Sequence, residues 1–314
     1  MKKKNSGAFN AIYNSTMTDA DDHFLSYIAN IVFNAFLCYT TIMLNVITIH
    51  ALRKTSSLPK PLKTLLLSLA VSDLGVGLLC QPMYITYLVV KLVPNTENSF
   101  TLLSLFNMVT NLLSYASFFG VTALTVDRFL DIHFYLRYQD LVTHERVVRV
   151  VILLWVISAF LSFLSLSFNF GWLSLNLVTL LAVFASIEVS YLITCALLYY
   201  KIYLAVQHHR NQIHALQVQQ EEQNSEMANA ARLRKSAIGT FYVYLLFLAC
   251  YLPNICVYFA EISGASTTAR VFAIYAWTVI FLNSALDPLI YCWKMRHIRH
   301  AVMDILRKIL PSHN

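Results

Sequence analysis

Charged residues are scarce in this chain. Of its 314 residues only 12% are Asp, Glu, Lys or Arg, whereas 58% are hydrophobic. A soluble domain carries about a quarter charged residues, so this composition excludes an ordinary soluble domain and indicates a membrane protein.

Cysteine is missing from every segment expected to lie outside the membrane. All six cysteines fall within apolar stretches, and none has the spacing of metal ligands. We therefore predict small buried side chains, no outer disulfide and no cysteine metal site. The six cysteines are Cys38, Cys80, Cys195, Cys250, Cys256 and Cys292.

Glycine-rich linkers, internal repeats and a cleavable signal sequence are absent as well. The chain has only 7 Gly, and no apolar core precedes Phe24. The first apolar stretch would then itself direct membrane insertion, and a single membrane domain is expected.

Seven long apolar stretches are present instead. Since a helix needs roughly 20 apolar residues to span a bilayer, they predict an all-α membrane protein with a seven-helix bundle. The expected domains are an extracellular tail (1–23), the transmembrane domain (24–293) and a cytoplasmic tail (294–314) that begins with a short amphipathic helix. The predicted spans are 24–52, 62–90, 100–130, 148–168, 177–206, 235–260 and 269–293.

The basic residues predict the orientation. Lys2, Lys3, Lys4, Lys91 and Arg270 flank one side of the spans, and the remaining 18 of the 23 Lys and Arg flank the other. The positive-inside rule places the second side in the cytoplasm, which fits a multi-pass protein of the plasma membrane with an extracellular N-terminus. These cations flank spans, so no nucleic-acid partner is expected.

Three segments outside the spans carry weaker signals. Asn14-Ser15-Thr16 is an acceptor triplet for glycosylation at Asn14, although such triplets also occur by chance. Residues 207–234 favour either helical extensions of spans five and six or a solvated linker. Residues 294–309 place apolar side chains at helical spacing opposite a basic face, as in a helix lying on anionic membrane lipids; a basic tail without order is the alternative.

Isolated polar residues converge on one layer of the membrane. Polar residues of four spans occupy similar depths, at 1.5 Å of rise per residue: Asn45, Asp73, Ser117, Asn283 and Asp287. Two carboxylates cannot both remain charged and unpaired there, so either a small hard cation such as sodium or a neutral hydrogen-bonded network is expected.

The inner ends of the spans carry a second group of unusual residues. Asp127 and Arg128 form an adjacent pair of opposite charges at the end of the third span, and prolines interrupt spans six and seven at Pro253 and Pro288. Such prolines create deformable points in a helix.

These features together resemble the rhodopsin-like (class A) G-protein-coupled receptors over nearly the whole chain. The matching residues are Asn45, the run Leu69 to Asp73, Asp127-Arg128-Phe129, Trp155, Phe247 with Cys250-Tyr251-Leu252-Pro253, and Asp287-Pro288-Leu289-Ile290-Tyr291. The resemblance implies a receptor without enzymatic activity that signals to heterotrimeric G proteins, with arrestin and membrane lipids as further partners.

The resemblance also implies roles for individual residues. Asp73, Ser117, Asn283, Ser284 and Asp287 would form an allosteric sodium site, and no other cofactor is expected. The residues implied in G-protein coupling and activation are Asp127, Arg128, Tyr199, Phe247, Tyr251, Pro253, Pro288 and Tyr291.

Several positions depart from the family pattern. Leu103 replaces a cysteine of the usual outer disulfide, Tyr191 replaces the proline of span five, Tyr251 a tryptophan of span six and Tyr135 a proline of the second inner loop. These departures look most like the melanocortin, cannabinoid, lysophospholipid and adenosine receptor group. A melanocortin ligand is not favoured, because the acidic residues that it requires are replaced by Gln81, Asn107 and Asn111.

A polar stripe on span three suggests where a ligand binds. Asn107, Thr110, Asn111 and Ser114 follow helical spacing, and Glu188 in span five is a further candidate anchor or a lipid-headgroup contact. Because Thr110 stands where amine receptors keep a carboxylate, a lipid, nucleoside or peptide is expected in preference to an amine.

Two further expectations concern function. A transporter that uses Asp73 and Asp287 as relay carboxylates is the alternative to a receptor, although transporters usually show repeated halves. In many relatives an acid at the inner end of span six also holds the arginine that matches Arg128. Here that end is basic from Arg232 to Lys235, so Asp127 alone would hold Arg128 and basal signalling should be high.

Overall fold

The computed structural model describes residues 24–56, 58–92, 99–134, 137–170, 177–215, 220–264 and 267–309. The proposed N-terminal tail, including Asn14, lies outside these residues, as does Tyr135. The described side chains exclude those of residues 208–237.

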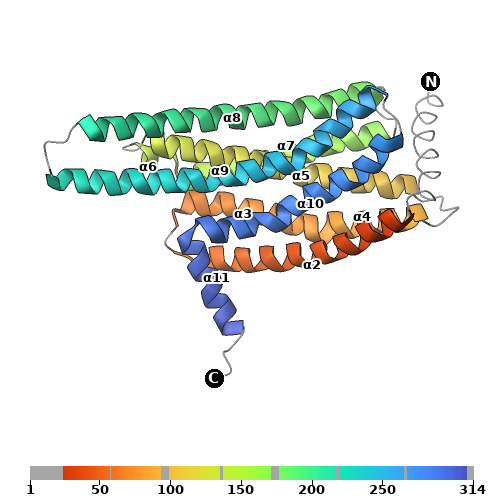
Figure 1. Cartoon of the computed structure of the whole chain (residues 1–314), viewed down its shortest axis with the longest axis horizontal. Helices are drawn as coiled ribbons and strands as arrows, with labels where there is room; N and C mark the ends of the chain where they lie inside the picture. The colour runs from red at the N-terminus through yellow and green to blue at the C-terminus, as the bar shows by residue number, and fades with distance from the viewer. Residues whose placement is uncertain are drawn as a thin grey trace.

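The described residues form a bundle of long helices that run along one common direction (Figure 1). Seven of the helical segments are long and apolar enough to cross a membrane, which confirms the predicted seven-helix fold. The elements are α2 (Phe24–Lys54), α3 (Lys60–Gly75), η1 (Val76–Cys80), α4 (Gln81–Leu92), α5 (Ser99–His133), α6 (Tyr138–Leu141), α7 (His144–Asn169), α8 (Leu177–Ala215), α9 (Gln220–Ile262), α10 (Thr267–Lys294) and α11 (Arg296–Ile309).

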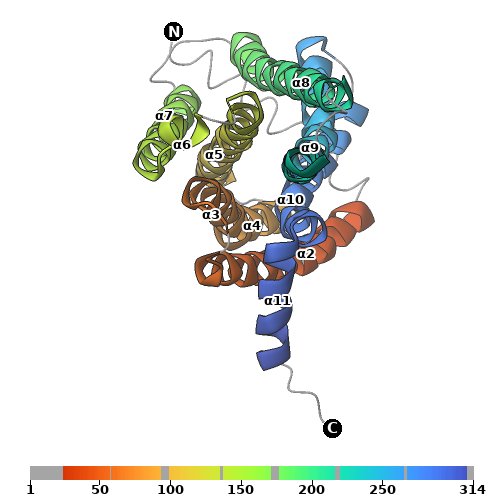
Figure 2. The ribbon, with the colours of Figure 1, turned by 90° about the vertical axis from the view of Figure 1, so that its left-hand side faces the viewer.

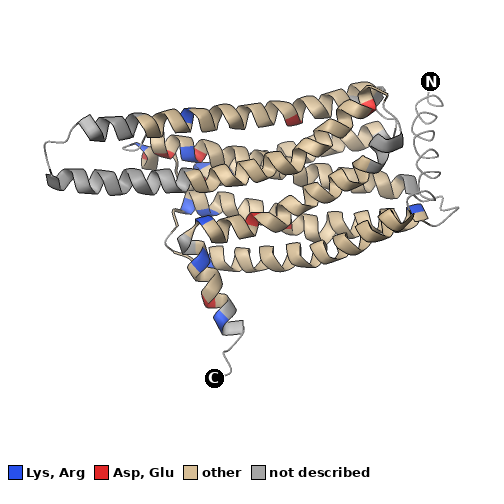
Figure 3. Ribbon diagram, in the orientation of Figure 1, with Lys and Arg blue, Asp and Glu red and all other residues tan. Residues whose placement is uncertain are grey.

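Viewed along the bundle, α5 lies among α3, α7, α8 and α9, and α10 lies between α9 and α2 (Figure 2). Local sequence explains several helix ends. α2 ends on Arg53 and Lys54, and α7 begins behind Thr143, whose side-chain oxygen accepts a hydrogen bond from the Arg146 backbone at 3.4 Å. The described Lys and Arg gather mainly at the end of the bundle that carries α6 and α11 (Figure 3).

The second span is not one regular α-helix. A π-helical turn, η1, separates α3 from α4 and was not predicted from the sequence. Next to it, the Cys38 thiol donates a hydrogen bond to the Gly77 carbonyl at 3.1 Å. A Cβ at Gly77 would lie 2.9 Å from a side-chain carbon of Ile42, so only glycine permits this close approach of α2.

Spans five and six extend well beyond the expected membrane boundary. α8 continues to Ala215 and α9 begins at Gln220, which favours the helical interpretation of this segment over a linker. The last helix, α11, turns away from the bundle axis (Figure 1). Its Ile298 and Ile305 are buried, whereas Arg299 and Arg307 are exposed, so the predicted amphipathic helix is confirmed.

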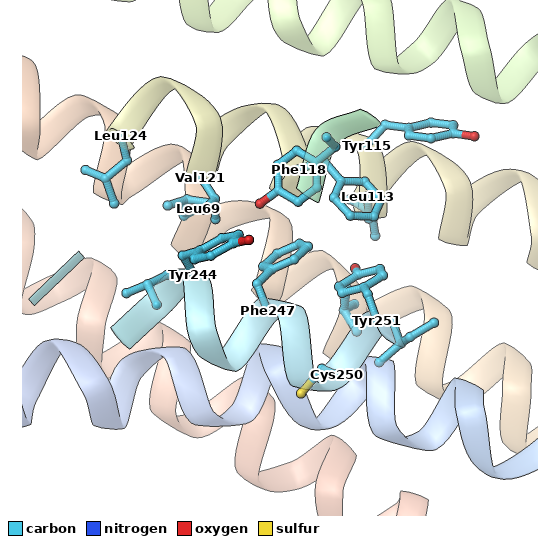
Figure 4. Packing of buried hydrophobic residues seen from close by; sticks show 14 of the residues in the cluster. Leu69, Leu113, Tyr115, Phe118, Val121, Leu124, Tyr244, Phe247, Cys250 and Tyr251 are labelled. Carbon is cyan, nitrogen blue, oxygen red and sulfur yellow. The ribbon is translucent and has the colours of Figure 1, made fainter. Parts of the chain in front are cut away.

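All six cysteines are free. Aromatic residues of α5 and α9 pack closely in the bundle interior. Phe118 of α5 packs against Tyr251 of α9 with ring centroids 4.6 Å apart, and Tyr251 stacks on Phe247 at 4.4 Å (Figure 4).

Candidate functional site

The predicted polar layer exists, and it is completely enclosed. Asp73 and Asp287 are 0% and 1% exposed, and the Asp73 carboxylate faces Ser284 and Asp287 across the contact between α3 and α10. The amide of Asn283 donates to Oδ2 of Asp287 at 3.3 Å. The structure thus brings four of the five predicted sodium ligands together.

The Ser117 side chain does not point toward the two carboxylates, as a sodium ligand would. Its hydroxyl donates to Oγ of Ser72 at 3.0 Å, on the residue next to Asp73. Asn45 supports the layer from α2, because its amide donates to the backbone carbonyls of Ser284 and Thr41, both at 2.9 Å.

Acceptor oxygens remain unpaired in this layer. No hydrogen bond from any described residue reaches either carboxylate oxygen of Asp73, Oδ1 of Asp287, or the amide oxygens of Asn45 and Asn283. Unpaired buried acceptors are unfavourable unless a cation or a proton satisfies them. Hard oxygen ligands of this kind fit a sodium ion.

Arg128 lies near the C-terminal end of α5 between two carboxylates. Its guanidinium binds Asp127 through Nε at 3.0 Å and also through Nη2. Nη1 donates to Oδ2 of Asp131 at 3.1 Å. The arginine and Asp127 side chains are 5% and 3% exposed, so this is a largely buried ion pair. The sequence analysis did not select Asp131, and the expectation that Asp127 alone holds Arg128 is wrong.

A tyrosine of the short helix α6 extends this group. The Tyr138 hydroxyl of α6 donates to Oδ1 of Asp127 at 2.7 Å. Burial, together with the negative charge of Asp127, raises the pKa of Tyr138 above its usual range. The hydroxyl therefore keeps its proton and remains a donor at neutral pH.

Tyr199 and Tyr291, the other two residues expected to rearrange on activation, do not contact the Arg128 group in the hydrogen bonds of the described residues. Thr125 donates to the Tyr199 hydroxyl at 3.2 Å, and the Tyr199 ring stacks on Tyr244 at 5.2 Å. Tyr291 is fully buried one turn beyond Asp287, and its hydroxyl has no hydrogen-bond partner among the described residues.

Both helix-interrupting prolines lie inside long helices, Pro253 in α9 and Pro288 in α10. Next to Pro253, the rings of Tyr251 and Phe247 pack on Tyr191 and Phe118, the Tyr191 and Phe118 centroids being 4.6 Å apart. Tyr191 therefore fills the position of the missing span-five proline with an aromatic contact between helices.

The polar stripe of α5 does not face a single direction. The amide of Asn111 donates to the Ser165 hydroxyl of α7 at 3.0 Å, and buried Thr110 lies beside Cys80 at the end of η1. Asn107 and Ser114 are half-buried.

Glu188 points into the bundle from α8. It is 6% exposed, and the amide of Asn254 on α9 donates to its two carboxylate oxygens at 3.3 and 3.4 Å. Asn254 was not selected from the sequence, although it directly follows Pro253 and is a polar residue in an apolar span.

A further buried network, also missed, connects the outer parts of α2, α4 and α10. Thr278 donates to Oδ1 of Asn30 at 2.7 Å, the Asn34 amide donates to both of these residues, and the Tyr84 hydroxyl donates to the Ile274 carbonyl at 2.6 Å. Asn30 and Asn34, one turn apart in a span without charged residues, could have indicated this network from the sequence.

Comparisons with known proteins agree with this arrangement. The profile of the 7 transmembrane receptor (rhodopsin family) matches residues 44–291. The histamine H2 receptor of Canis lupus familiaris is 26% identical over 296 residues, which cover 88% of this chain and 79% of that receptor.

Two other relatives come from the receptor group that the sequence departures suggested. Adenosine receptor A2b of Gallus gallus is 26% identical over 317 residues, which cover 89% of this chain and 88% of the relative. Melanocortin receptor 4 of Danio rerio is 25% identical over 275 residues, with coverages of 83% and 78%. Because the family profile spans most of the chain, this protein belongs to the rhodopsin family of seven-transmembrane receptors.

Proposed function

We propose that this receptor transmits the binding of an extracellular ligand to heterotrimeric G proteins. The observation that supports this most directly is Arg128, a buried arginine held by two acids of its own helix at the basic end of the bundle. A buried arginine can be released from intrahelical acids without breaking a contact between helices, and it is then available to a cytoplasmic partner.

The proposed topology follows the distribution of charge. The end of the bundle with α6 and α11 faces the cytoplasm of a plasma-membrane protein, and the N-terminal tail (1–23) lies outside. The 24–293 domain spans the membrane, and the 294–314 tail places α11 on the inner leaflet. Lipids would contact its basic face, and arrestin is a second cytoplasmic partner.

The ligand would bind at the outer ends of α5 and α8, near Asn107, Thr110, Ser114 and Glu188, and Asn111 would support the site through α7. A lipid, a nucleoside or a peptide fits a site without a carboxylate at Thr110. The aromatic group of Phe118, Phe247 and Tyr251 joins this region to the prolines, so a ligand that favours one packing of these rings would bias the inner end.

The experiment is a ligand-panel screen with G-protein dissociation sensors in transfected cells. Arg128→Ala should abolish both the basal and the ligand-stimulated responses at equal surface expression. Arg149→Ala, which removes an exposed cation at the start of α7, is the matched control and should keep them.

A flux assay beside the sensor assay separates the receptor from a transporter that relays protons or ions through Asp73 and Asp287. Ion flux in vesicles of the purified protein, without any sensor response, would contradict the proposed function. A sensor response that Arg128→Ala removes, without flux, would support it.

A further inference from the structure

Glu188 is a buried acid that is not among the residues implied in G-protein coupling and activation. Residues of two other helices lie at its side chain on α8: Asn254 of α9 donates to both carboxylate oxygens, Tyr258 of α9 also hydrogen-bonds to it, and Tyr115 of α5 lies nearby. The span of α8 begins at Leu181, seven residues earlier, so Glu188 lies about 10 Å inside that end.

The charge of this carboxylate is not balanced within the described part of the chain. Glu188 forms no salt bridge with any described residue. Its donors there are neutral: the Asn254 amide, at the long distances of 3.3 and 3.4 Å, and the Tyr258 side chain. A buried carboxylate without a cation is unfavourable, so the site requires a positive charge or a proton from outside.

We propose that Glu188 binds a cationic group of the ligand, such as an ammonium or imidazolium of a small molecule or a basic side chain of a peptide. This inference rests on the proposed receptor function and specifies its ligand. Tyr115 and Tyr258 lie near Glu188, and aromatic side chains are favourable neighbours for a cation. Asn254 would remain a donor to the second carboxylate oxygen.

This position differs from the one expected for an amine receptor. Thr110 on α5 cannot balance a positive charge, so the cation would lie between α5, α8 and α9 instead. Because the buried Glu188 can balance a positive charge where Thr110 cannot, the absence of a carboxylate at Thr110 does not disfavour a cationic ligand.

A cation at Glu188 would also act on the helix that carries Pro253. It would compete with the Asn254 amide, which forms a direct polar contact between α8 and α9. Tyr191 lies one turn from Glu188 and packs 5.6 Å from the centroid of Phe247. Weakening the Glu188–Asn254 contact would therefore change the packing beside the proline.

The test is thermal unfolding of the purified full-length receptor with matched pairs of compounds. The cations are 2-phenylethylamine, tyramine and short, N-terminally acetylated peptides with one lysine, and each is compared with the form in which its remaining amine is acetylated. At least one cation should raise the unfolding temperature while its acetylated form does not. The small-molecule and peptide arms distinguish the two sources of the positive charge.

Variants then test the residue. Glu188→Gln should weaken the effective cation by at least about tenfold, because it removes one partner of a buried charge pair. Glu188→Asp, which keeps the charge, should bind more tightly than Glu188→Gln and serves if the glutamine variant does not fold. Glu261→Gln removes an exposed acid at the outer end of α9 and should bind like the wild type.

Three results would overturn the inference: no cation of the panel stabilises the receptor, only neutral compounds do so, or Glu188→Gln and Glu188→Asp bind the cation as the wild type does. Its failure differs from failure of the proposed function. Cation binding without any G-protein response contradicts only the signalling role, whereas Arg128-dependent signalling to neutral ligands alone contradicts only the cation site.

Discussion

Oδ2 of Asp131 lies 3.1 Å from Nη1 of Arg128, one turn farther along α5. Together with Asp127, it places a carboxylate on two sides of the guanidinium. The restraint on Arg128 therefore includes two acids of its own helix.

Asp131→Asn should raise basal signalling, because the amide keeps the shape but loses the charge. The Asp131 side chain is 20% exposed, so the pair contributes about 0.2–1 kcal/mol and its loss raises the active population roughly 1.4- to 5-fold. Ligand-free sensor activity at equal surface expression is the measurement. Asp140→Asn, at an exposed acid of α6, should leave it unchanged. An unaltered basal level in Asp131→Asn would rule out this restraint.

The sequence was sufficient for the seven spans and for the depth of the polar layer, because both follow from the near absence of charge. It did not single out Asp131, because this acid lies at the end of a span, where charged residues are common. The direction in which a helix presents its side chains depends on packing. Ser117 and Asn111 have the expected spacing, but they contact Ser72 and Ser165.

The π-helical turn at η1 was missed for a related reason. A single turn with one extra residue leaves no periodic pattern in a span that is apolar on most sides. The need for glycine at position 77 is visible only when α2 is packed against η1.

Tyr138→Phe should also raise basal signalling, by a similar or smaller factor, because it removes the 2.7 Å hydrogen bond that orients Asp127. Since the pKa of Tyr138 is raised, the hydroxyl stays protonated well past neutral pH, and the contribution is lost only in strongly alkaline solution. The difference between variant and wild type should therefore be equal at about pH 6.5 and about pH 8.5. A difference that disappears between these values would contradict the role of Tyr138 as a neutral donor.

Reductant should not change the thermal stability of the purified receptor, because all six cysteines are free. A structural disulfide typically contributes about 2–4 kcal/mol, which would appear as a clear drop in unfolding temperature. The comparison is an unfolding curve with and without dithiothreitol. A large loss on reduction would show that a disulfide forms after all.

Sodium should lower basal signalling through the polar layer around Asp73. A cation that binds the buried oxygens of Asp73, Asn283 and Asp287 stabilises the closed bundle relative to the active one. The measurement is nucleotide exchange on a G protein by receptor membranes in sodium chloride and in potassium chloride. Sodium should reduce the rate by roughly fivefold or more.

Variants of this layer should separate an ion site from a neutral network. Asp73→Asn removes a charge from the layer and should abolish the difference between the two salts. Ser117→Ala should retain most of it, because the Ser117 hydroxyl bonds to Ser72 rather than to a carboxylate. Asp304→Asn, at an exposed acid of α11, controls for a general effect of charge and should behave like the wild type. If Asp73→Asn keeps the wild-type response to sodium, the two carboxylates form a protonated network and hold no ion.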